Sequence, residues 1–233
     1  MKPFFKAMYI RRHDLALRLA LKAISKGDHG GYYTIADIGR AEVIRDMGVS
    51  SKRIPAWLLP NSCLSVAGID PTDRNRIRPD IMLTEMTHTE LMSYSTGGME
   101  HPELSTTIIG LRPSGSTGPR RRKIWVLEGG YTADTRHLDK VEEKQSQHAQ
   151  LMHALQVRGF DAKLMVLTFG LGATIYQQAA EDLHALGVNM SSVKKTLKAI
   201  HLHSVECAVN IITQRRIMDR QKLFRSKAPT KPP

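Results

Sequence analysis

Apolar residues recur in the first third of the chain at spacings typical of amphipathic helices and of strands. Over 11–24 they fall at i, i+3, i+4 and i+7, which predicts a helix, and we expect Gly27 to close that helix in the left-handed conformation. The segment 32–38 is rich in aromatic and β-branched residues and therefore predicts a strand. A short helix over 41–47 is expected next, followed by an extended segment over 54–59.

Strand and helix patterns alternate in the second half of the chain. A strand over 77–83 is expected at an edge or a bulge, because Pro79 cannot donate to a neighbouring strand. A strand followed by a helix then occurs twice, and the parallel crossover that this order implies predicts an α/β sheet. The predicted elements are strands over 123–127 and 161–168, a helix over 136–158 capped by Gly159, a helix from the turn at 170–174 to about 186, and a last helix capped by Ser191 or Ser192 that runs toward Lys222.

Serine, threonine, glycine and proline dominate residues 87–122. Such a composition is typical of a partly mobile insertion or a long hairpin. We therefore expect a single domain over 11–222 that carries this insertion. An arm, residues 1–10, is expected before it, and a basic, proline-rich and disordered tail, residues 223–233, after it.

The composition restricts the classes of protein and of partner. The 233 residues include 34 Lys and Arg against 22 Asp and Glu, a net charge of +12, and 41% are hydrophobic, as in an ordinary globular domain. No apolar run approaches the roughly 18 residues of a membrane span, and two cysteines cannot form a disulfide framework. We expect a soluble intracellular protein whose charge favours nucleic acid as its first partner and an acidic membrane surface as its second.

Two carboxylates lie where strands are predicted. Asp80 is in the middle of the strand predicted over 77–83, and Glu128 ends the next one before a break at Gly129 and Gly130. A carboxylate at the end of a buried strand is costly to desolvate unless it binds a cation or accepts hydrogen bonds. Because Mg²⁺ prefers a few hard oxygen ligands, the pair is a candidate metal site. An ordinary turn or hydrogen-bonding role is the alternative for each of them.

The helix predicted over 136–158 carries four polar side chains on one face, which we expect to point back toward Glu128. They are Lys140, Lys144, Gln147 and His148. A lysine in that place can orient water or neutralise a phosphate, and a histidine can contact a phosphate or carry a proton. The combination indicates metal-assisted hydrolysis of a phosphodiester. A solvated charged face, in which Glu142 and Glu143 separate the lysines, is the alternative explanation.

Several short motifs hold these residues. They are RRHD at 11–14, RPD at 78–80, WVLE at 125–128, K-x-x-Q-H-x-x-L at 144–151, G-F-x-x-x-L-x-V-L at 159–167 and the turn G-x-G-A-T at 170–174. Together they resemble the PD-(D/E)xK nuclease superfamily. More narrowly, the chain is similar over about residues 11–220 to the restriction-enzyme-like endonuclease domain at the C-terminus of site-specific non-LTR retrotransposon polyproteins, in which RRHD resembles the segment after a Cys/His zinc knuckle.

The resemblance implies a PD-(D/E)xK restriction-endonuclease-like core, an α/β fold with a mixed central sheet flanked by helices. It implies that Asp80 and Glu128 bind Mg²⁺ or Mn²⁺ and that Lys144 is the catalytic lysine. Gly130 stands where the motif lysine would be, so the lysine would have moved onto the helix. The family's helix typically reads K-x-x-K-Y-x-x-L, and its second lysine and tyrosine are replaced here. The supporting residues are Lys140, Gln147 and His148.

The resemblance thus implies a metal-dependent endonuclease that nicks target DNA for retroelement insertion and acts in the nucleus. Its expected partner is DNA, or else RNA, and a membrane is not expected as a partner. An upstream reverse transcriptase and zinc knuckle are expected in a full-length element. The residues expected to meet the nucleic-acid backbone are Arg11, Arg12, Arg120, Arg121, Arg122 and Lys123. Two alternatives stay open: a catalytically inactive nucleic-acid-binding remnant of the same fold, and a structural protein whose basic residues are spread evenly.

Overall fold

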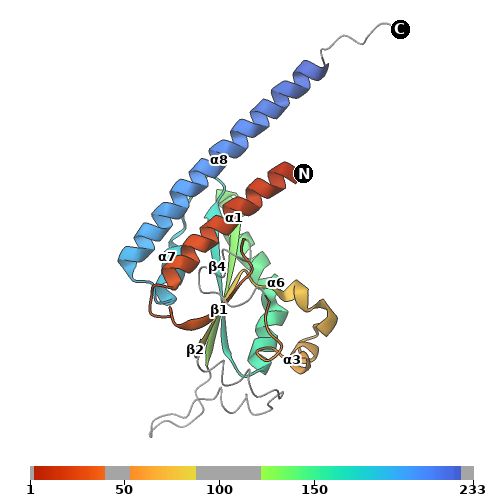
Figure 1. Ribbon diagram of the computed structural model, residues 1–233, viewed down its shortest axis with the longest axis vertical. Helices are drawn as coiled ribbons and strands as arrows, with labels where there is room; N and C mark the ends of the chain where they lie inside the picture. The colour runs from red at the N-terminus through yellow and green to blue at the C-terminus, as the bar shows by residue number, and fades with distance from the viewer. Residues whose placement is uncertain (1–2, 40–52, 88–121, 227–233) are drawn as a thin grey trace, which may run out of the picture.

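The computed structural model describes residues 3–39, 53–87 and 122–226 (Figure 1). Helices and strands alternate along most of this length. In chain order the elements are α1 (Pro3–Ile24), β1 (Tyr32–Ala36), α3 (Asn61–Val66), the 3-10 helix η1 (Pro71–Ile77), β2 (Ile81–Thr87), β3 (Lys123–Thr132), the 3-10 helix η2 (Asp134–Arg136), α6 (His137–Val157), β4 (Asp161–Gly170), α7 (Gln177–Ala185) and α8 (Met190–Ser226).

Four strands form one mixed sheet in the order β1-β2-β3-β4. The pairs β1 with β2 and β2 with β3 are antiparallel, whereas β3 and β4 are parallel over ten residues each and are joined through α6. The parallel crossover predicted from the sequence is therefore confirmed, and the chain has a mixed α/β fold.

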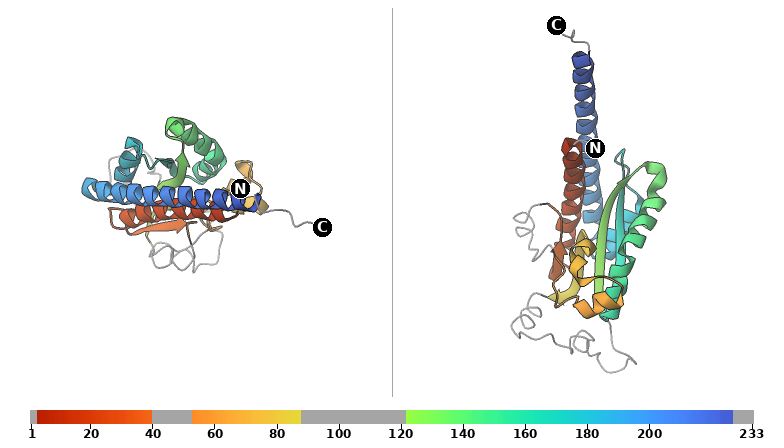
Figure 2. Two further views of the ribbon diagram at one scale, coloured as in Figure 1. Left: turned by 90° about the horizontal axis from the view of Figure 1, so that it is seen from above. Right: turned by 90° about the vertical axis from the view of Figure 1, so that its right-hand side faces the viewer.

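Helices cover both faces of the sheet (Figure 2). Side chains of β3 alternate between the faces, as the two-residue repeat of a strand requires. Trp125 and Leu127 pack with α1, α7 and α8, while Ile124 and Val126 pack with α3 and α6. Each face of the sheet consequently has its own apolar core.

The two longest helices on one face, α1 and α8, run side by side (Figures 1 and 2). Val193, Leu197 and Ile200 of α8 are buried in the same core as Leu17 and Leu21 of α1. The blue helix α8 is 37 residues long and continues well past the N-terminus of α1. One side of its far half is therefore exposed.

Helix α1 starts earlier than its apolar spacing predicted. It begins at Pro3, so residues 3–10, expected as an arm, are its first turns. Gly27 does not adopt the left-handed conformation; its amide donates to the carbonyl of Ile24 at 3.0 Å, and a side chain there would meet the carbonyl of Gly187. The glycine therefore serves a close approach between two loops.

The segment after β1 also differs from the prediction. The stretch 54–59 is a turn, since the amides of Leu58 and Leu59 both donate to the carbonyl of Pro55 at 3.1 Å. The short helices α3 and η1 were not predicted. The helix predicted over 41–47, residues 88–121 of the insertion and residues 227–233 of the tail lie outside the described residues.

The strands at the two candidate carboxylates are displaced from their predicted bounds. Strand β2 begins at Ile81, and it lies between β1 and β3 rather than at an edge. Pro79 precedes it and so needs no partner for the missing N–H. Strand β3 continues through Gly129 and Gly130 instead of breaking there. Asp80 thus lies just before a strand, and Glu128 lies inside one.

Of two helix caps predicted from the sequence, one is confirmed and the other is displaced. Gly159 follows α6 with φ of 99°, and the amide of Phe160 donates to the carbonyl of Leu155 at 3.1 Å, so the predicted glycine cap is confirmed. At the start of α8 the cap is Asn189, whose Oδ1 accepts from the amide of Ser192 at 2.9 Å. Ser192 is therefore inside the helix rather than at its cap.

Candidate functional site

The two predicted carboxylates meet across strands β2 and β3. Ile81 pairs with Leu127 in the sheet, which places Asp80 opposite Glu128. The amide of Asp80 donates to Glu128 Oε1 at 3.0 Å, and the amide of Gly129 donates to Asp80 Oδ2 at 2.8 Å. Because each carboxylate is held by the backbone beside the other, both side chains are fixed in place.

Helix α6 supplies two side-chain partners for Glu128, which is 2% exposed. Lys144 Nζ lies 2.9 Å from Glu128 Oε2, and His148 Nε2 lies 3.0 Å from Oε1. Burial alone would raise the pKa of Glu128, but His148 and Lys144 outweigh burial and hold this pKa below its usual range. Glu128 is therefore an ionised carboxylate inside the protein.

Helix α1 contributes a second cation from the opposite face of the sheet. His13 Nε2 lies 3.2 Å from Asp80 Oδ2, and His13 Nδ1 lies 3.3 Å from Asp14 Oδ1. Burial lowers the pKa of His13, yet the hydrogen bonds to Asp14 and Asp80 outweigh it and raise the pKa to about 10. Asp14 also accepts a hydrogen bond from the amide of Gly39 at 3.0 Å. The histidine is thus an imidazolium that bridges two carboxylates.

These six side chains form what we call the carboxylate cluster. Its members are His13, Asp14, Asp80, Glu128, Lys144 and His148. Neither His13 nor Asp14 was predicted from the sequence to have a role. They belong to the RRHD motif, but only the packing of α1 on the sheet brings them near Asp80. Gly129 permits that approach, because a Cβ there would lie 3.1 Å from His13 Nε2.

Of the predicted supporting residues, the structure brings only His148 into the cluster. Lys140 covers Gly130 with its aliphatic chain, and its ammonium pairs with Glu143 at 2.6 Å. Gln147 is exposed on the outer side of α6. The spacing of the four residues correctly indicates one broad face, but only the part of it that carries Lys144 and His148 reaches the sheet.

The residues predicted to contact nucleic acid differ in their exposure. Arg12, predicted to meet the backbone of DNA, is 2% exposed and donates to the carbonyls of Gly170 and Leu171 at 3.3 and 2.9 Å. Its guanidinium also stacks on the ring of Tyr131 at 4.0 Å. That prediction is corrected, because a buried arginine with these contacts serves the fold. Arg11 is exposed.

The remaining predicted contacts lie at or before the start of β3. Arg122 and Lys123 are half-buried, and both contact Glu85 of β2, Arg122 through its side chain and Lys123 through its amide. Arg120 and Arg121 lie outside the described residues. Between Lys123 and Glu128 the strand advances about 16 Å, so these two basic residues do not belong to the carboxylate cluster.

Comparisons with protein-family models, with curated proteins and with solved structures found no match. In the part of the chain that the structure describes, no helix combines the length and the apolar character needed to cross a bilayer.

The carboxylate cluster contains oxygen donors of the kind that a divalent cation prefers. Mg²⁺ is commonly held by one or two carboxylates together with water and substrate phosphate, and Asp80 and Glu128 supply two. Within the described residues, Asp80 Oδ1 has no hydrogen-bond partner, whereas its Oδ2 accepts from Gly129 and His13. No three His, Cys, Asp or Glu side chains in those residues are grouped to hold a metal by themselves. Asp80 Oδ1 is therefore the oxygen open to an ion that also binds substrate oxygens, while the two oxygens of Glu128 face Lys144 and the amide of Asp80.

Proposed function

We propose that this chain is a metal-dependent DNA endonuclease that hydrolyses a phosphodiester and nicks its target, as the endonuclease domains of non-LTR retrotransposons do. One observation carries the proposal: Asp80, Glu128 and Lys144 come from separate segments and meet at one point of the sheet. Two carboxylates joined to a lysine ammonium are a set suited to phosphodiester hydrolysis. The expectation that these three residues act together gains support from their contacts.

The elements that bear these residues also support a PD-(D/E)xK-like core. Asp80 precedes β2, Glu128 lies in β3, and Lys144 lies on α6, which follows β3 directly. The sheet is mixed and has helices on both faces, which is the architecture that the resemblance implies. Lys144 on the helix would serve as the lysine that Gly130 does not supply in the strand motif.

The protein's own residues have separable tasks at this site. Asp80 and Glu128 would hold Mg²⁺ or Mn²⁺, and the chemistry that such an ion supplies is neutralisation of the charge on the phosphate. Lys144 holds Glu128 in place and presents an ammonium that can donate to a phosphate oxygen or to the attacking water. His13 holds Asp80 from the other side through its imidazolium. The cations also make the site attractive to an anionic substrate.

Plasmid nicking tests the proposal. Purified protein is incubated with supercoiled plasmid in Mg²⁺, in Mn²⁺ and in EDTA, and nicked circles are measured on a gel. We expect nicking with either metal and none in EDTA. The double variant Asp80→Asn with Glu128→Gln should lose nicking by about a thousandfold or more, because both metal ligands lose their charge.

The matched control is Asp139→Asn with Glu143→Gln. Both of these carboxylates are exposed on α6, and their removal changes the net charge equally. This control should nick at the rate of the unchanged protein. Equal rates for the control and the Asp80/Glu128 double variant would contradict the proposal.

A second function is favoured by one specific observation. Both oxygens of Glu128 already face partners, since Lys144 lies at Oε2 and the amide of Asp80 at Oε1. A site whose charges are balanced without a metal is also suited to an inactive nucleic-acid-binding remnant. Calorimetric titration with Mg²⁺ and Mn²⁺ separates the two functions, because only the nuclease requires uptake that the Asp80/Glu128 double variant abolishes.

A further inference from the structure

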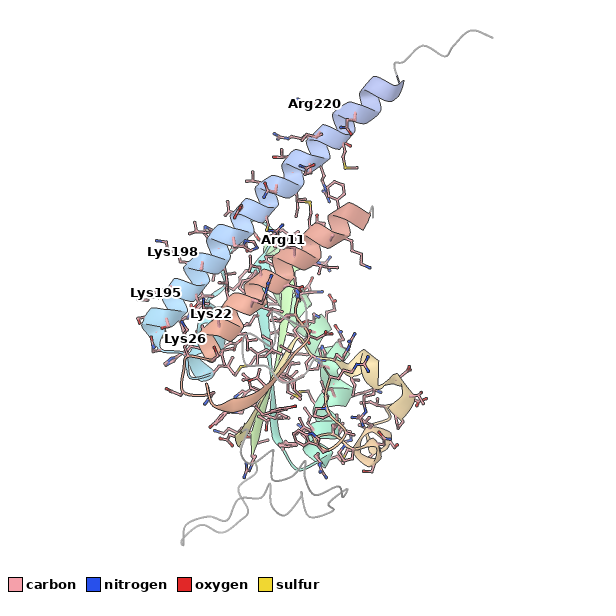
Figure 3. All side chains as sticks on the ribbon, in the orientation of Figure 1. Arg11, Lys22, Lys26, Lys195, Lys198 and Arg220 are labelled. Atoms are coloured by element: carbon pink, nitrogen blue, oxygen red, sulfur yellow. The ribbon has the colours of Figure 1, made fainter. Side chains whose placement is uncertain are left out.

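Two neighbouring helix segments are basic and contain no acidic residue. They are residues 15–27, mostly in α1, and residues 189–205, mostly in α8. Figure 3 shows Lys22 and Lys26 on α1 and Lys195 on α8 at the end of the helix pair where α8 begins. The basic residues of the two segments are Arg18, Lys22, Lys26, Lys194, Lys195 and Lys198.

A groove of about 240 Å³ lies between these segments. Its apolar lining comes from Leu19, Ala23 and Ala199, and Lys22, Lys26 and Lys195 line it from both helices. We call it the lysine groove. The small side chains of the two alanines let the helices approach while leaving a concave surface between them.

The three groove lysines have no ion-pair partner among the described residues, and all three are exposed. Like charges brought together on one surface repel each other, so such an arrangement slightly destabilises the fold unless an anion binds. The first turn of α8 adds to the effect, because Ser192 also lines the groove and a helix N-terminus carries partial positive charge. The groove is therefore suited to a ligand with several negative charges.

We propose that the lysine groove binds the phosphate backbone of duplex DNA. The choice of DNA rests on the proposed function, and the groove adds a contact surface outside the carboxylate cluster. From His13 in the cluster to Lys22 at the groove, α1 advances about 14 Å, which is less than the ~34 Å of one turn of duplex. A concave site with lysines on both walls fits a narrow, charged strand better than it fits a flat bilayer surface. Lysine binds phosphate as a point charge and without sequence preference.

Salt-dependent binding of a labelled 20-base-pair duplex in EDTA tests this proposal without cleavage. The groove variant is Lys22→Gln, Lys26→Gln and Lys195→Gln. Each phosphate contact contributes about 0.9 to the slope of log affinity against log salt, so the slope should fall by about 2.7. The same relation predicts a loss of affinity of roughly 100-fold at 150 mM salt.

The matched control removes the same charge from the other end of the same two helices. It is Lys6→Gln, Arg216→Gln and Arg220→Gln, all exposed. We expect this control to lose less than about threefold in affinity, and the arginine form of the groove variant, Lys22→Arg with Lys26→Arg and Lys195→Arg, to bind as the unchanged protein does. No variant should lower the thermal midpoint, since the altered side chains are on the surface.

Several outcomes would overturn the proposal. Equal losses in the groove variant and the control would show that total charge, rather than the groove, sets affinity. No loss in the groove variant, or a failure of the arginine form to restore binding, would also reject it. A groove variant that keeps DNA binding but no longer binds phosphatidylserine vesicles would assign the groove to membranes.

Binding and nicking fail independently in this design. If the unchanged protein binds DNA through the groove but never nicks plasmid, the groove stands and the proposed nuclease function falls. If it nicks plasmid and the groove variant binds normally, the nuclease function stands and the groove proposal falls.

Discussion

The carboxylate cluster and the lysine groove are both rich in charged side chains, but among the described residues the charges are paired in the cluster and unpaired in the groove. In the cluster, Glu128 is buried and each carboxylate faces a cation at 2.9 to 3.3 Å. In the groove, Lys22, Lys26 and Lys195 are exposed and form no ion pair with the described residues. Helix α1 contributes to both, because its His13 faces the sheet and its Lys22 and Lys26 line the groove beside α8.

The difference separates two physical tasks. Balanced charges in a buried place are rigid, because losing any partner leaves an ion without compensation. Exposed charges without an ion-pair partner can change conformation at little cost in free energy, and they can attract an oppositely charged partner. The cluster thus has the properties of a site that positions reacting groups, and the groove has those of a surface that binds an anionic partner.

The largest expected effect on stability comes from breaking a buried ion pair of α6, and an exposed ion pair on the same helix serves as its comparison. Lys144→Met removes the ammonium that pairs with the buried Glu128 and should lower the free energy of unfolding by about 3 kcal/mol. Lys140→Met breaks a pair whose Glu143 is 61% exposed, and should cost less than about 1 kcal/mol. Urea unfolding of both variants measures the contrast. Equal losses would remove the distinction between compensated and surface charge on α6.

Two adjacent arginines test whether burial or charge decides a residue's task. Arg12→Gln should lower the free energy of unfolding by about 2 to 3 kcal/mol, because the carbonyls of Gly170 and Leu171 lose a charged donor. Arg11→Gln, on the exposed side of α1, should stay within about 0.5 kcal/mol. Chemical denaturation gives both values. An Arg12 variant of normal stability that lost DNA binding would return Arg12 to the surface role predicted from sequence.

The cluster should also give stability a pH dependence. The pKa of His13 is raised from 6.5 to about 10, so its stabilising effect is complete below pH 6.5 and is lost as pH rises toward 10. The loss should be on the order of 2 kcal/mol, because one pKa unit corresponds to about 1.4 kcal/mol and water screens a partly exposed group. Unfolding curves at several pH values, compared with those of His13→Gln, measure it. Parallel pH profiles for the two proteins would show that His13 is not held as an imidazolium.

The smallest expected effect concerns a single groove lysine. Lys22→Gln should change the free energy of unfolding by less than about 0.5 kcal/mol and should lower the salt slope of DNA binding by about 0.9. Lys6→Gln, at the other end of α1, should leave the slope unchanged. Fluorescence anisotropy across a salt series resolves the two. A lower slope for both lysines would make the whole helix, rather than the groove, the contact.

The crossover from β3 through α6 to β4 is the part of the fold that sequence patterns predicted best. Its strands are apolar runs, its helix has a long repeat, and Gly159 marks the end of that helix. The convergence of Lys144 and His148 on Glu128 also follows from sequence, since residues four apart share a helix face. Local periodicity is sufficient here because the three elements are consecutive.

Other features depend on contacts between distant segments. The donor in Arg12 and its acceptor in Gly170 are 158 positions apart, so no local pattern reveals that this arginine is buried. Gly129 was expected to break a strand, but it stays in β3 and makes room for His13. Ile77 was assigned to β2, but it ends the 3-10 helix η1, which begins where Asp70 accepts from the amide of Thr72 at 2.8 Å.

The nicking rate at saturating plasmid, measured with Mg²⁺ for the unchanged protein, Glu128→Gln and the triple groove variant, tests the division of tasks most directly. We predict that Glu128→Gln falls by about a thousandfold, while the groove variant stays within about threefold once DNA is saturating. Nicking by Glu128→Gln at the unchanged rate, or a groove variant as slow as Glu128→Gln, would contradict the account.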